Sequence, residues 1–512
     1  MRRLFFITLQ LLTFQNLFSQ NSGAALFDSA MANYRAGKNQ EAILLFDAVI
    51  AKQLDNADAF LFRGLCKARV GDNEHAEQDF SAVISLNSRY GDAWFYRGTS
   101  RLRQNKNETA LADFEQAVLI DSGNADACYQ AANLENVFKK YNDAIKHLNV
   151  VLGKQPMNFQ AFNARGFSYF SLGDYKSATE DFSKAISLKP DLTDAYFYLA
   201  ICSQRLQNNA AALKYFDKVI QLNPAYSDAW LSRGNLKSKT GDNTGAIADY
   251  QQFLKLQPKN ADAWVSIGTA EVSLKKNDSA LLAFSRAIEL DSQNAKAFFE
   301  LAKVQNALTK TEEAIITLQH SILLDPSNGL AYFEMAMIHL QKKNYSEALK
   351  QIDQSIWHGN NSADAYFYRG LCYERLDKLP DALTSYGMVI EKNPGYADAY
   401  YSRGIVHRKL GDYKGSLTDF SENLKLDPAN AESFYNRGMS HNDLGDTLNA
   451  RLDFNQAILL DPKFGEAFNA LAMLDYKQGK KESACLLWQK AGDLGYAHAL
   501  DVMKIYCKPE DK

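Results

Sequence analysis

Small and apolar residues recur along this chain with a fixed period of 34 residues, from Gly23 to His498. Within each period the apolar residues fall on two stretches with the three- and four-residue spacing of an amphipathic α-helix. Fourteen consecutive periods fit between these two residues without an insertion. A period of this length is typical of repeat proteins, in which each unit buries its apolar face against its neighbours. We therefore expect an all-α array of helix pairs.

Two positions of the repeat, counted from the first residue of each unit, hold small residues. Position 8 is Gly or Ala in all fourteen units, and position 20 is Ala in thirteen, with Ser416 the exception. A larger side chain would push two helices apart, so these positions predict that the two helices of a unit approach closely. Position 4 is aromatic in twelve units and position 24 in eleven, for example Trp94 and Phe114. We expect these rings to fill the space that the small residues leave.

Proline and glycine mark the ends of the predicted helices. Eight of the ten prolines stand at position 32, where the second helix of a unit has to stop. Glycine occupies position 15 in seven units, and in five of these it is followed by Asp, a usual first residue of a helix. The pattern therefore predicts a turn between the two helices at position 15.

These features resemble the tetratricopeptide repeat, W-x2-L-G-x2-Y…A-x3-F…P, in the period, in the small residues at 8 and 20, and in the aromatic residues at 4 and 24. The resemblance covers residues 23–498, nearly the whole chain after the predicted signal peptide and a short leader at 20–22. It implies a right-handed superhelical solenoid, with the first helices lining a concave groove and the second helices outside. It also implies binding of peptides or protein segments. Ala497–Tyr506 predicts a last helix that covers the open apolar end, followed by a polar tail within 499–512.

Position 7 departs from the quoted pattern, because it is Arg in seven units where Leu is expected. Asp stands at position 23 in six of these units and in no other unit. We infer a structural Arg-to-Asp bridge between the two helices, because an unpaired member of a buried pair is costly. The pairs are Arg63 with Asp79, Arg97 with Asp113, Arg165 with Asp181, Arg233 with Asp249, Arg403 with Asp419, and Arg437 with Asp453. Arg369, which faces Ser385, is the mismatch.

If the first helices line a groove, positions 2, 5, 6, 9, 12 and 13 face the ligand. Position 5 is aromatic in nine units, and these rings either pack between repeats or anchor an apolar segment of a partner. The candidate groove residues are Tyr129, Phe197, Phe299, Glu300, Phe333, Glu334, Phe367 and Tyr401. Position 2 is acidic in ten units, which indicates helix capping or an acidic rim for basic partner segments.

Repeats 8 to 10, residues 261–362, lack both the Arg at position 7 and the Asp at position 23. They carry Lys296 and Leu330 at position 2, and the sequence IWHGNNS replaces the proline turn at their end. Departures from a repeat consensus often carry contacts. This stretch is therefore either a flexible joint or a specialised binding region around Phe299, Glu300, Phe333 and Glu334.

The first 19 residues combine two arginines, an uncharged and mainly apolar run, and a small residue at Ser19. This order is typical of a secretory signal peptide, and we expect cleavage near Gln20. The apolar run from Leu4 to Phe18 is short and polar for a membrane span, and no second run of spanning length follows. The sequence thus predicts an exported protein in the periplasm, at the cell surface or outside the cell.

The six cysteines do not form an obvious disulfide framework. Cys66, Cys202 and Cys372 share position 10 of distant repeats, where a small apolar side chain would pack. Cys485 and Cys507 are near enough in sequence to meet, but their spacing does not settle whether they form a bridge.

Composition narrows the function further. With 57 Lys and Arg against 60 Asp and Glu, the chain has no basic footprint for nucleic acid. We find no phosphate-binding, zinc-protease or serine-hydrolase motif, and helix spacing places His339, His407, His441 and Asp475 too far apart to share a metal ion. We therefore expect no enzyme activity, cofactor or metal, and a scaffold or adaptor that binds protein partners. The alternatives are a self-assembling solenoid and an accessory subunit of a glycan- or envelope-processing complex.

Overall fold

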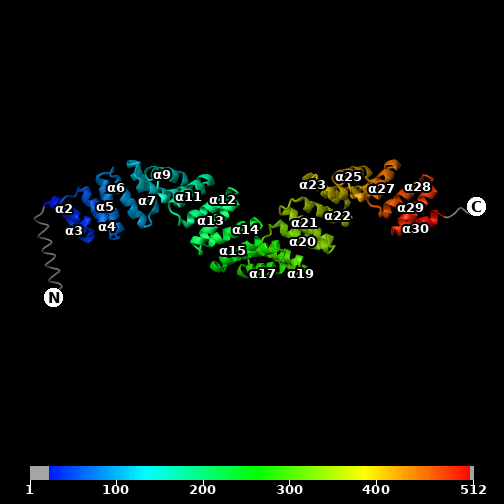
Figure 1. The fold of residues 1–512 in the computed structure, drawn as a ribbon, viewed down its shortest axis with the longest axis horizontal. Coiled ribbons are helices and arrows are strands. Elements are labelled where there is room, and N and C mark those ends of the chain that lie inside the picture. The colour runs from blue at the N-terminus through cyan, green and yellow to red at the C-terminus, as the bar shows by residue number, and fades with distance from the viewer. Residues whose placement is uncertain (1–21, 508–512) are drawn as a thin grey trace, which may run out of the picture. The chain divides into compact units, whose positions relative to one another are not determined.

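The computed structural model describes residues 22–507, and the predicted signal peptide therefore lies outside the described residues. The described chain is all α-helical and divides at Gln257 and Pro258 into two compact units, each a stack of helix pairs (Figure 1). Each pair corresponds to one predicted repeat, with a first helix of 13 residues and a second helix of 13 or 14 residues. The predicted solenoid of paired helices is confirmed.

Unit 1 contains repeats 1 to 7. Its helices are α2 (Gly23–Arg35), α3 (Asn39–Lys52), α4 (Ala57–Arg69), α5 (Asn73–Leu86), α6 (Gly91–Arg103), α7 (Asn107–Ile120), α8 (Ala125–Val137), α9 (Tyr141–Lys154), α10 (Phe159–Ser171), α11 (Tyr175–Leu188), α12 (Thr193–Arg205), α13 (Asn209–Leu222), α14 (Ser227–Lys239) and α15 (Asn243–Leu256).

Unit 2 contains repeats 8 to 14 and a last single helix. Its helices are α16 (Ala261–Ser273), α17 (Asn277–Leu290), α18 (Ala295–Ala307), α19 (Thr311–Leu324), α20 (Gly329–Gln341), α21 (Tyr345–Trp357), α22 (Ala363–Arg375), α23 (Leu379–Lys392), α24 (Ala397–Lys409), α25 (Tyr413–Leu426), α26 (Ala431–Asp443), α27 (Thr447–Leu460), α28 (Gly465–Lys477), α29 (Lys481–Asp493) and α30 (Ala497–Tyr506).

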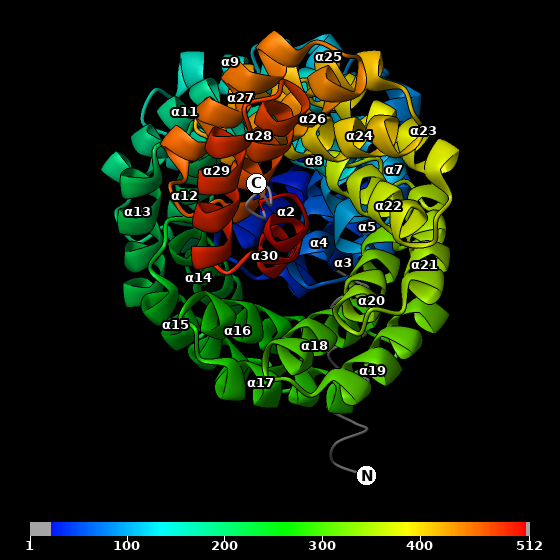
Figure 2. The same ribbon diagram turned by 90° about the vertical axis from the view of Figure 1, so that its right-hand side faces the viewer.

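Each unit curves so that its first helices lie inside and its second helices lie outside. Figure 2 shows this order in unit 1, where α12 and α14 lie inside α11, α13 and α15. The same view shows it in unit 2, where α16, α18, α20 and α22 lie inside α17, α19, α21 and α23. The first helices of each unit therefore line its concave face.

The turn inside each repeat requires a left-handed backbone at position 15. The five glycines that precede Asp have φ between 79° and 92°, for example Gly173 at 82°. Seven other repeats adopt the same conformation without glycine, and Thr309, at φ 60°, does so with a β-branched side chain. The Asp that follows each of the five glycines caps the second helix as predicted, for example Asp174, which accepts a hydrogen bond from the backbone N–H of Ser177.

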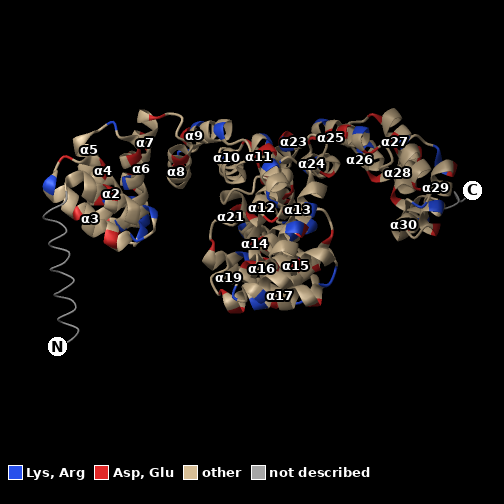
Figure 3. Cartoon of the chain, turned by 60° about the vertical axis from the view of Figure 1, so that its left-hand side comes forward, with Lys and Arg blue, Asp and Glu red and all other residues tan. Residues whose placement is uncertain are grey.

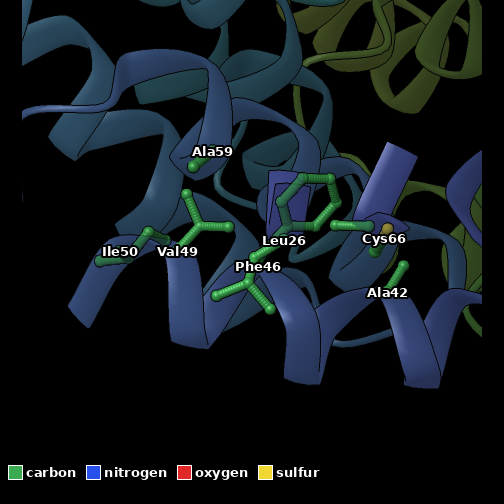
Figure 4. Packing of buried hydrophobic residues seen from close by; sticks show 8 residues of the cluster. Leu26, Ala42, Phe46, Val49, Ile50, Ala59 and Cys66 are labelled. Carbon is green, nitrogen blue, oxygen red and sulfur yellow. The ribbon is translucent and has the colours of Figure 1, made fainter. Parts of the chain in front are cut away.

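The core of each repeat forms where the position-24 ring lies against the small residue at position 8. A Cβ atom added to Gly98 would stand 2.9 Å from the ring of Phe114, so the ring occupies the space that a side chain would need. In repeats 1 and 2, Leu26, Ala42 and Phe46 pack with residues of the next helix, including Cys66 (Figure 4). The position-24 rings thus fill the predicted space.

The position-4 rings do not fill that space, which corrects the sequence expectation. They are mostly half-buried, and in six repeats each one lies below the guanidinium at position 7 of its own repeat. In the third repeat the Cζ atom of Arg97 is 4.7 Å from the centre of the Trp94 ring. These rings therefore support the arginines.

The cysteines fall into two groups, buried thiols inside the repeats and a bonded pair near the end of the chain. Cys66, Cys202 and Cys372 are fully buried, and burial raises the pKa of the Cys66 thiol to about 11. Cys485 and Cys507 form a disulfide with a Cα–Cα distance of 5.8 Å. The bridge ties the end of α30 to α29, and Trp488 and Tyr506 stack at a ring distance of 6.0 Å. The predicted cap is thus fastened both by packing and by a covalent bond.

Candidate binding groove

Two hollows lie in the concave face of unit 1. The first, of about 440 Å³, is lined by α8, α10 and α12 and by the residue that precedes α12. The second, of about 460 Å³, is lined by α4, α6 and α8 and by a ring from α5. Both are formed by repeat positions that the sequence assigns to the groove.

The lining of the first hollow consists mostly of amides and aromatic rings. It comprises Tyr129, Asn133, Asn136, Phe159, Gln160, Asn163, Ala164, Phe167, Leu192, Asp194 and Tyr198. The lining of the second hollow is more apolar and carries two guanidinium groups. It comprises Leu65, Ala68, Arg69, Phe80, Phe95, Tyr96, Thr99, Ser100, Arg103 and Gln130.

Repeat 5 opens the first hollow because it lacks the rings of its neighbours. Positions 5 and 6 are Phe197 and Tyr198 in repeat 6 but Asn163 and Ala164 in repeat 5. The side chains of Asn163 and Ala164 are too small to cover the groove floor, so a ligand-sized space remains. The sequence contains this signal, but two missing rings do not by themselves predict a hollow.

The floor of the first hollow offers an unused hydrogen-bond acceptor. The side-chain oxygen of Asn163 is buried and has no hydrogen-bond partner. Asn136, by contrast, donates to the carbonyl of Ala164 (3.3 Å) and accepts from the hydroxyl of Ser168 (2.7 Å). Burial and the nearby carboxylate of Asp194 raise the pKa of Tyr198, which keeps its hydroxyl protonated. The hollow therefore presents neutral hydrogen-bonding groups between rings, together with the carboxylate of Asp194.

The position-5 rings have a packing role throughout the array. Phe197 contacts Phe216 of α13 edge-on at 6.0 Å, and the Phe367 ring lies 5.7 Å from Tyr386 of α23. Tyr401 packs on Phe420 in the same way, and its hydroxyl donates to Glu432 of the next repeat (2.9 Å). Tyr129 lines the first hollow directly. Since these rings stay half-buried, one edge belongs to the core and the other faces the groove.

Repeats 8 to 10 are more tightly packed than the sequence suggested. Phe299 is 9% exposed and belongs to a core cluster with Leu318, so most of its ring packs within the array, which is the first of the two interpretations of the position-5 rings. Phe333 lies 6.1 Å from the ring of Tyr368. Where other repeats have an Arg and an Asp, repeat 9 buries Leu301 and Thr317. Uncharged contacts therefore replace the ion pair in repeat 9.

The two glutamates predicted beside these rings lie near one lysine. Lys303 pairs with Glu300 at 3.0 Å, and its ammonium also lies 5.2 Å from the centre of the Phe299 ring. Glu334 is half-buried, and burial raises its pKa despite the attraction of Lys303. The charged side chains of this stretch therefore interact largely with one another.

All six predicted Arg-to-Asp pairs are in contact. In repeat 5, Arg165 donates from Nε and Nη2 to the two oxygens of Asp181, both at 2.7 Å. The same two-bond arrangement occurs in the other five repeats. The aspartates are buried, and the arginines lie partly in solvent. The arrangement indicates a structural role for these arginines.

The arginines also reach a third helix, which the sequence analysis missed. The Nη1 atom of Arg165 donates to Asn149 of the preceding repeat at 2.5 Å, and Arg97 reaches Ser81 in the same way at 3.1 Å. Arg369, which has no Asp at position 23, donates instead to Asp353 of the preceding repeat at 2.8 Å. The partner is a polar residue at position 25, which the other repeats except repeat 11, with Gly387, also carry, so sequence alone does not mark it.

Position 2 does not cap the first helices. In seven repeats the cap is the Asn immediately before the helix, such as Asn124, which accepts from the N–H of Ala127 at 2.9 Å. The ten position-2 carboxylates are exposed, and Asp58 and Asp194 accept hydrogen bonds from the hydroxyls of Tyr90 and Tyr226. They therefore form an exposed row of carboxylates near the N-terminal ends of the first helices.

The three histidines at position 11 have separate environments. His407 and His441 face Asp412 and Asp446 at the start of their own second helices. Asp475 instead interacts with Arg451 and accepts from Ser483. Within residues 22–507, no group of three His, Cys, Asp or Glu side chains has the geometry to hold a metal ion.

Charges of both signs are interspersed along the helices of each unit (Figure 3). No helix in the described part of the chain combines the length and the apolar character that crossing a membrane requires.

Comparison with known proteins identifies the repeat. A model of the tetratricopeptide repeat matches residues 27–69, 67–127, 231–295, 333–397 and 375–431, which together make up more than half of the chain. Further tetratricopeptide repeat models match residues 159–192, 193–226 and 431–464.

Similar proteins resemble parts of the chain at modest identity. The tetratricopeptide repeat and J domain-containing co-chaperone DNJ1 of Fusarium oxysporum is 37% identical over 59 residues, which are 12% of this chain and 11% of that protein. The crystal structure of YrrB, a TPR protein with an unusual peptide-binding site, is 23% identical with a TM-score of 0.36 over 37% of this chain and 97% of that one. Cut9 with Hcn1, from the APC/C, is 14% identical with a TM-score of 0.35 over 90% and 98% of the two chains.

The family assignment rests on the repeat models and on the paired helices that they match. The family consists of scaffolds for protein–protein interaction that are typically not enzymes. The chain belongs to the tetratricopeptide repeat family.

Proposed function

We propose that this chain is an exported, non-enzymatic scaffold that holds extended segments of partner proteins in the concave groove of unit 1. The observation that carries the proposal is the pair of hollows, which five first helices from α4 to α12 line between them. Both hollows expose rings and hydrogen-bonding side chains from positions that recur in every repeat. A segment of extended chain can therefore contact several repeats in succession.

The binding mechanism is the sum of many shallow contacts on a preformed surface. Tyr129 and Tyr198 frame the first hollow, and Phe95 and Tyr96 frame the second. Because these rings already pack against the core, a partner does not have to order them on binding. The amide of Asn163 can pair with the main chain of the partner, which gives affinity without strict dependence on its side chains.

Filling the first hollow tests the proposal. Asn163→Phe with Ala164→Tyr gives repeat 5 the two rings that repeat 6 already carries at the same positions. The fold should accept them, because it does so in the neighbouring repeat. The immobilised wild-type and variant chains are incubated with envelope and secreted extract, and the bound proteins are identified by mass spectrometry.

A matched control separates loss of the hollow from added bulk. Val265→Phe with Ser266→Tyr places the same two rings at positions 5 and 6 of repeat 8 in unit 2. We expect partners to bind the wild-type chain and this control but not the chain whose hollow in repeats 4 to 6 is filled. Equal capture by all three chains would refute this placement of the site.

Export is supported by two independent features. The first 19 residues have the order of a signal peptide, and the disulfide between Cys485 and Cys507 is of the kind that persists in oxidising compartments. The mass of the protein purified from its native host tests this proposal. We expect a chain that begins near Gln20 and keeps the disulfide, whereas a cytoplasmic chain that retains Met1 would contradict export.

A further inference from the structure

The concave face of unit 1 has a row of carboxylates along one edge. These residues stand at position 2, near the N-terminal end of each first helix, and are exposed. The row comprises Asp58, Asp92, Asp126, Asp194 and Asp228. Two of the five accept a hydrogen bond from the tyrosine that ends their own repeat, Tyr90 or Tyr226. None of the five forms an ion pair within the described part of unit 1, so their negative charge is available to a ligand.

The opposite edge of the same face has a row of cations. These residues stand at position 13, the last residue of each first helix, and are exposed. The row comprises Arg35, Arg69, Arg103, Arg205 and Lys239. Arg69 lies 4.2 Å above the Tyr34 ring, and Arg103 donates to the carbonyl of Ala68 at 3.1 Å. These contacts position the side chains without neutralising them, and no described carboxylate of unit 1 pairs with any of the five.

Helix geometry places the two rows on the same face as the hollows. At 100° per residue, positions 2, 6, 9 and 13 fall within about 60° of one another around the helix axis. Positions 6 and 9 line both hollows, for example Tyr96 and Thr99 in the second. The rise per residue separates positions 2 and 13 by about 16 Å along the helix. The groove is thus bordered by negative charge on one side and positive charge on the other.

Helix stability alone does not explain the two rows. The helix dipole favours acids at the N-terminus and bases at the C-terminus, so this arrangement adds no strain. Repeats 9 and 10 in unit 2, however, form equally regular first helices with Lys296 and Ala307, or Leu330 and Gln341, at the same two positions. The fold therefore does not require the charges. Repeats 11, 12 and 14 of unit 2 carry them as well, and in unit 1 they border the two hollows.

We propose that unit 1 recognises the order of charges in its partner, an inference that rests on the groove function proposed above. The occupant is an extended protein segment whose successive side chains alternate between basic and acidic. In an extended chain alternate side chains point to opposite sides. One set therefore meets the carboxylate row and the other set meets the cation row. A segment with one sign of charge meets like charge along one edge.

The middle of the occupant is uncharged. Repeat 5 carries Gln160 and Ser171 at the two edge positions, and repeat 4 carries Val137 at position 13, so the carboxylate row is interrupted in repeat 5 and the cation row in repeats 4 and 5. The same repeat contributes Asn163, whose buried side-chain oxygen lacks a partner. A neutral residue that donates an N–H satisfies that oxygen. The segment thus has two stretches of alternating charge on either side of a neutral polar centre.

Two synthetic peptides of identical composition test the proposal. Each has about 16 residues, the length of extended chain that spans six first helices about 8 to 10 Å apart. In the first peptide Lys and Glu alternate on both sides of a central Asn-Thr-Asn. In the second, like charges are placed in adjacent pairs, so each edge of the groove meets both signs. Binding to the full chain is measured by fluorescence anisotropy at low salt and at about 0.5 M salt.

Charge reversal in the cation row of unit 1, with a matched control in unit 2, tests whether this edge of the groove contacts the peptide. Arg69→Glu with Arg103→Glu reverses part of the cation row in unit 1. Arg375→Glu with Lys477→Glu makes the same change in net charge at position 13 of unit 2. All four residues are exposed, so the variants should fold, and thermal melts monitored by circular dichroism check this.

We expect the alternating peptide to bind about tenfold tighter than the paired-charge peptide, with a preference that disappears at high salt. The unit 1 variant should lose about tenfold in affinity for the alternating peptide, and the unit 2 control should lose nothing. Equal binding of both peptides, if abolished by filling the hollow at Asn163 and Ala164, would overturn the charge-order inference and leave the groove function standing. Failure of the chain to bind either peptide would count against both.

Discussion

Removing the guanidinium of Arg165 while keeping Asp181 tests the main polar contact of the repeat. The carboxylate of Asp181 accepts both of its hydrogen bonds from Arg165 at 2.7 Å, and its side chain is 6% exposed. Arg165→Leu therefore leaves a buried carboxylate without its partner. Breaking a buried pair in this way costs about 3 to 5 kcal/mol. We expect a local loss of stability of that size in α10 and α11.

The companion variant uses a solution that the chain already contains. Arg165→Leu with Asp181→Thr gives repeat 5 the residues that repeat 9 buries at the same positions, Leu301 and Thr317. Replacing a buried ion pair by uncharged residues of suitable size is often close to neutral. We expect the double variant to lie within about 1 kcal/mol of the wild type, and hence a coupling energy of at least about 2 kcal/mol.

Hydrogen–deuterium exchange on the full chain measures this locally, because a long repeat array does not unfold in one step. A loss of about 3 to 5 kcal/mol raises amide exchange rates in α10 and α11 by about two to four orders of magnitude. Arg369→Leu is the control, because the partner of Arg369, Asp353, has a side chain that is 42% exposed. Exposed pairs contribute about 1 kcal/mol or less. Equal effects at Arg165 and Arg369, or a double variant that equals the sum of its singles, would refute the reasoning.

Three further predictions concern single features of the repeats. Thr309→Gly should stabilise repeat 9 by about 1 kcal/mol, seen as slower amide exchange in α18 and α19, because Thr309 has a positive φ that suits glycine; faster exchange there would contradict this. Reducing the bridge between Cys485 and Cys507, which closes a separation of 22 residues, should cost about 3 kcal/mol and speed exchange in α30, and unchanged protection there would count against it. The hydrogen bond to Glu135 raises the pKa of His147, so this pair should stabilise repeat 4 below about pH 6 and lose that effect as the pH rises through the raised pKa. His147→Gln should flatten this dependence in pH-resolved exchange, and an unaltered pH profile would disprove it.

The packing role of the groove rings explains why sequence reasoning about them was only partly right. Position 5 has helical periodicity and aromatic character, features that a core residue and a binding residue share. Phe299 is buried, whereas Tyr129 lines a hollow, although both occupy position 5 of their repeats. The difference depends on the neighbouring repeats, which a single position does not specify.

The sequence by itself determined the repeat, the two helices, the turn glycines and the Arg-to-Asp pairs. Each of these depends on contacts inside one repeat, and fourteen copies in one chain display the pairing as a correlation between positions. Tertiary structure decided which features act between neighbouring repeats. The third helix reached by Arg165 belongs to the preceding repeat, and the hollow beside Asn163 needs three first helices to enclose it. Such contacts join residues that no local pattern couples, so only the stacking of the repeats shows where the chain is open to a partner.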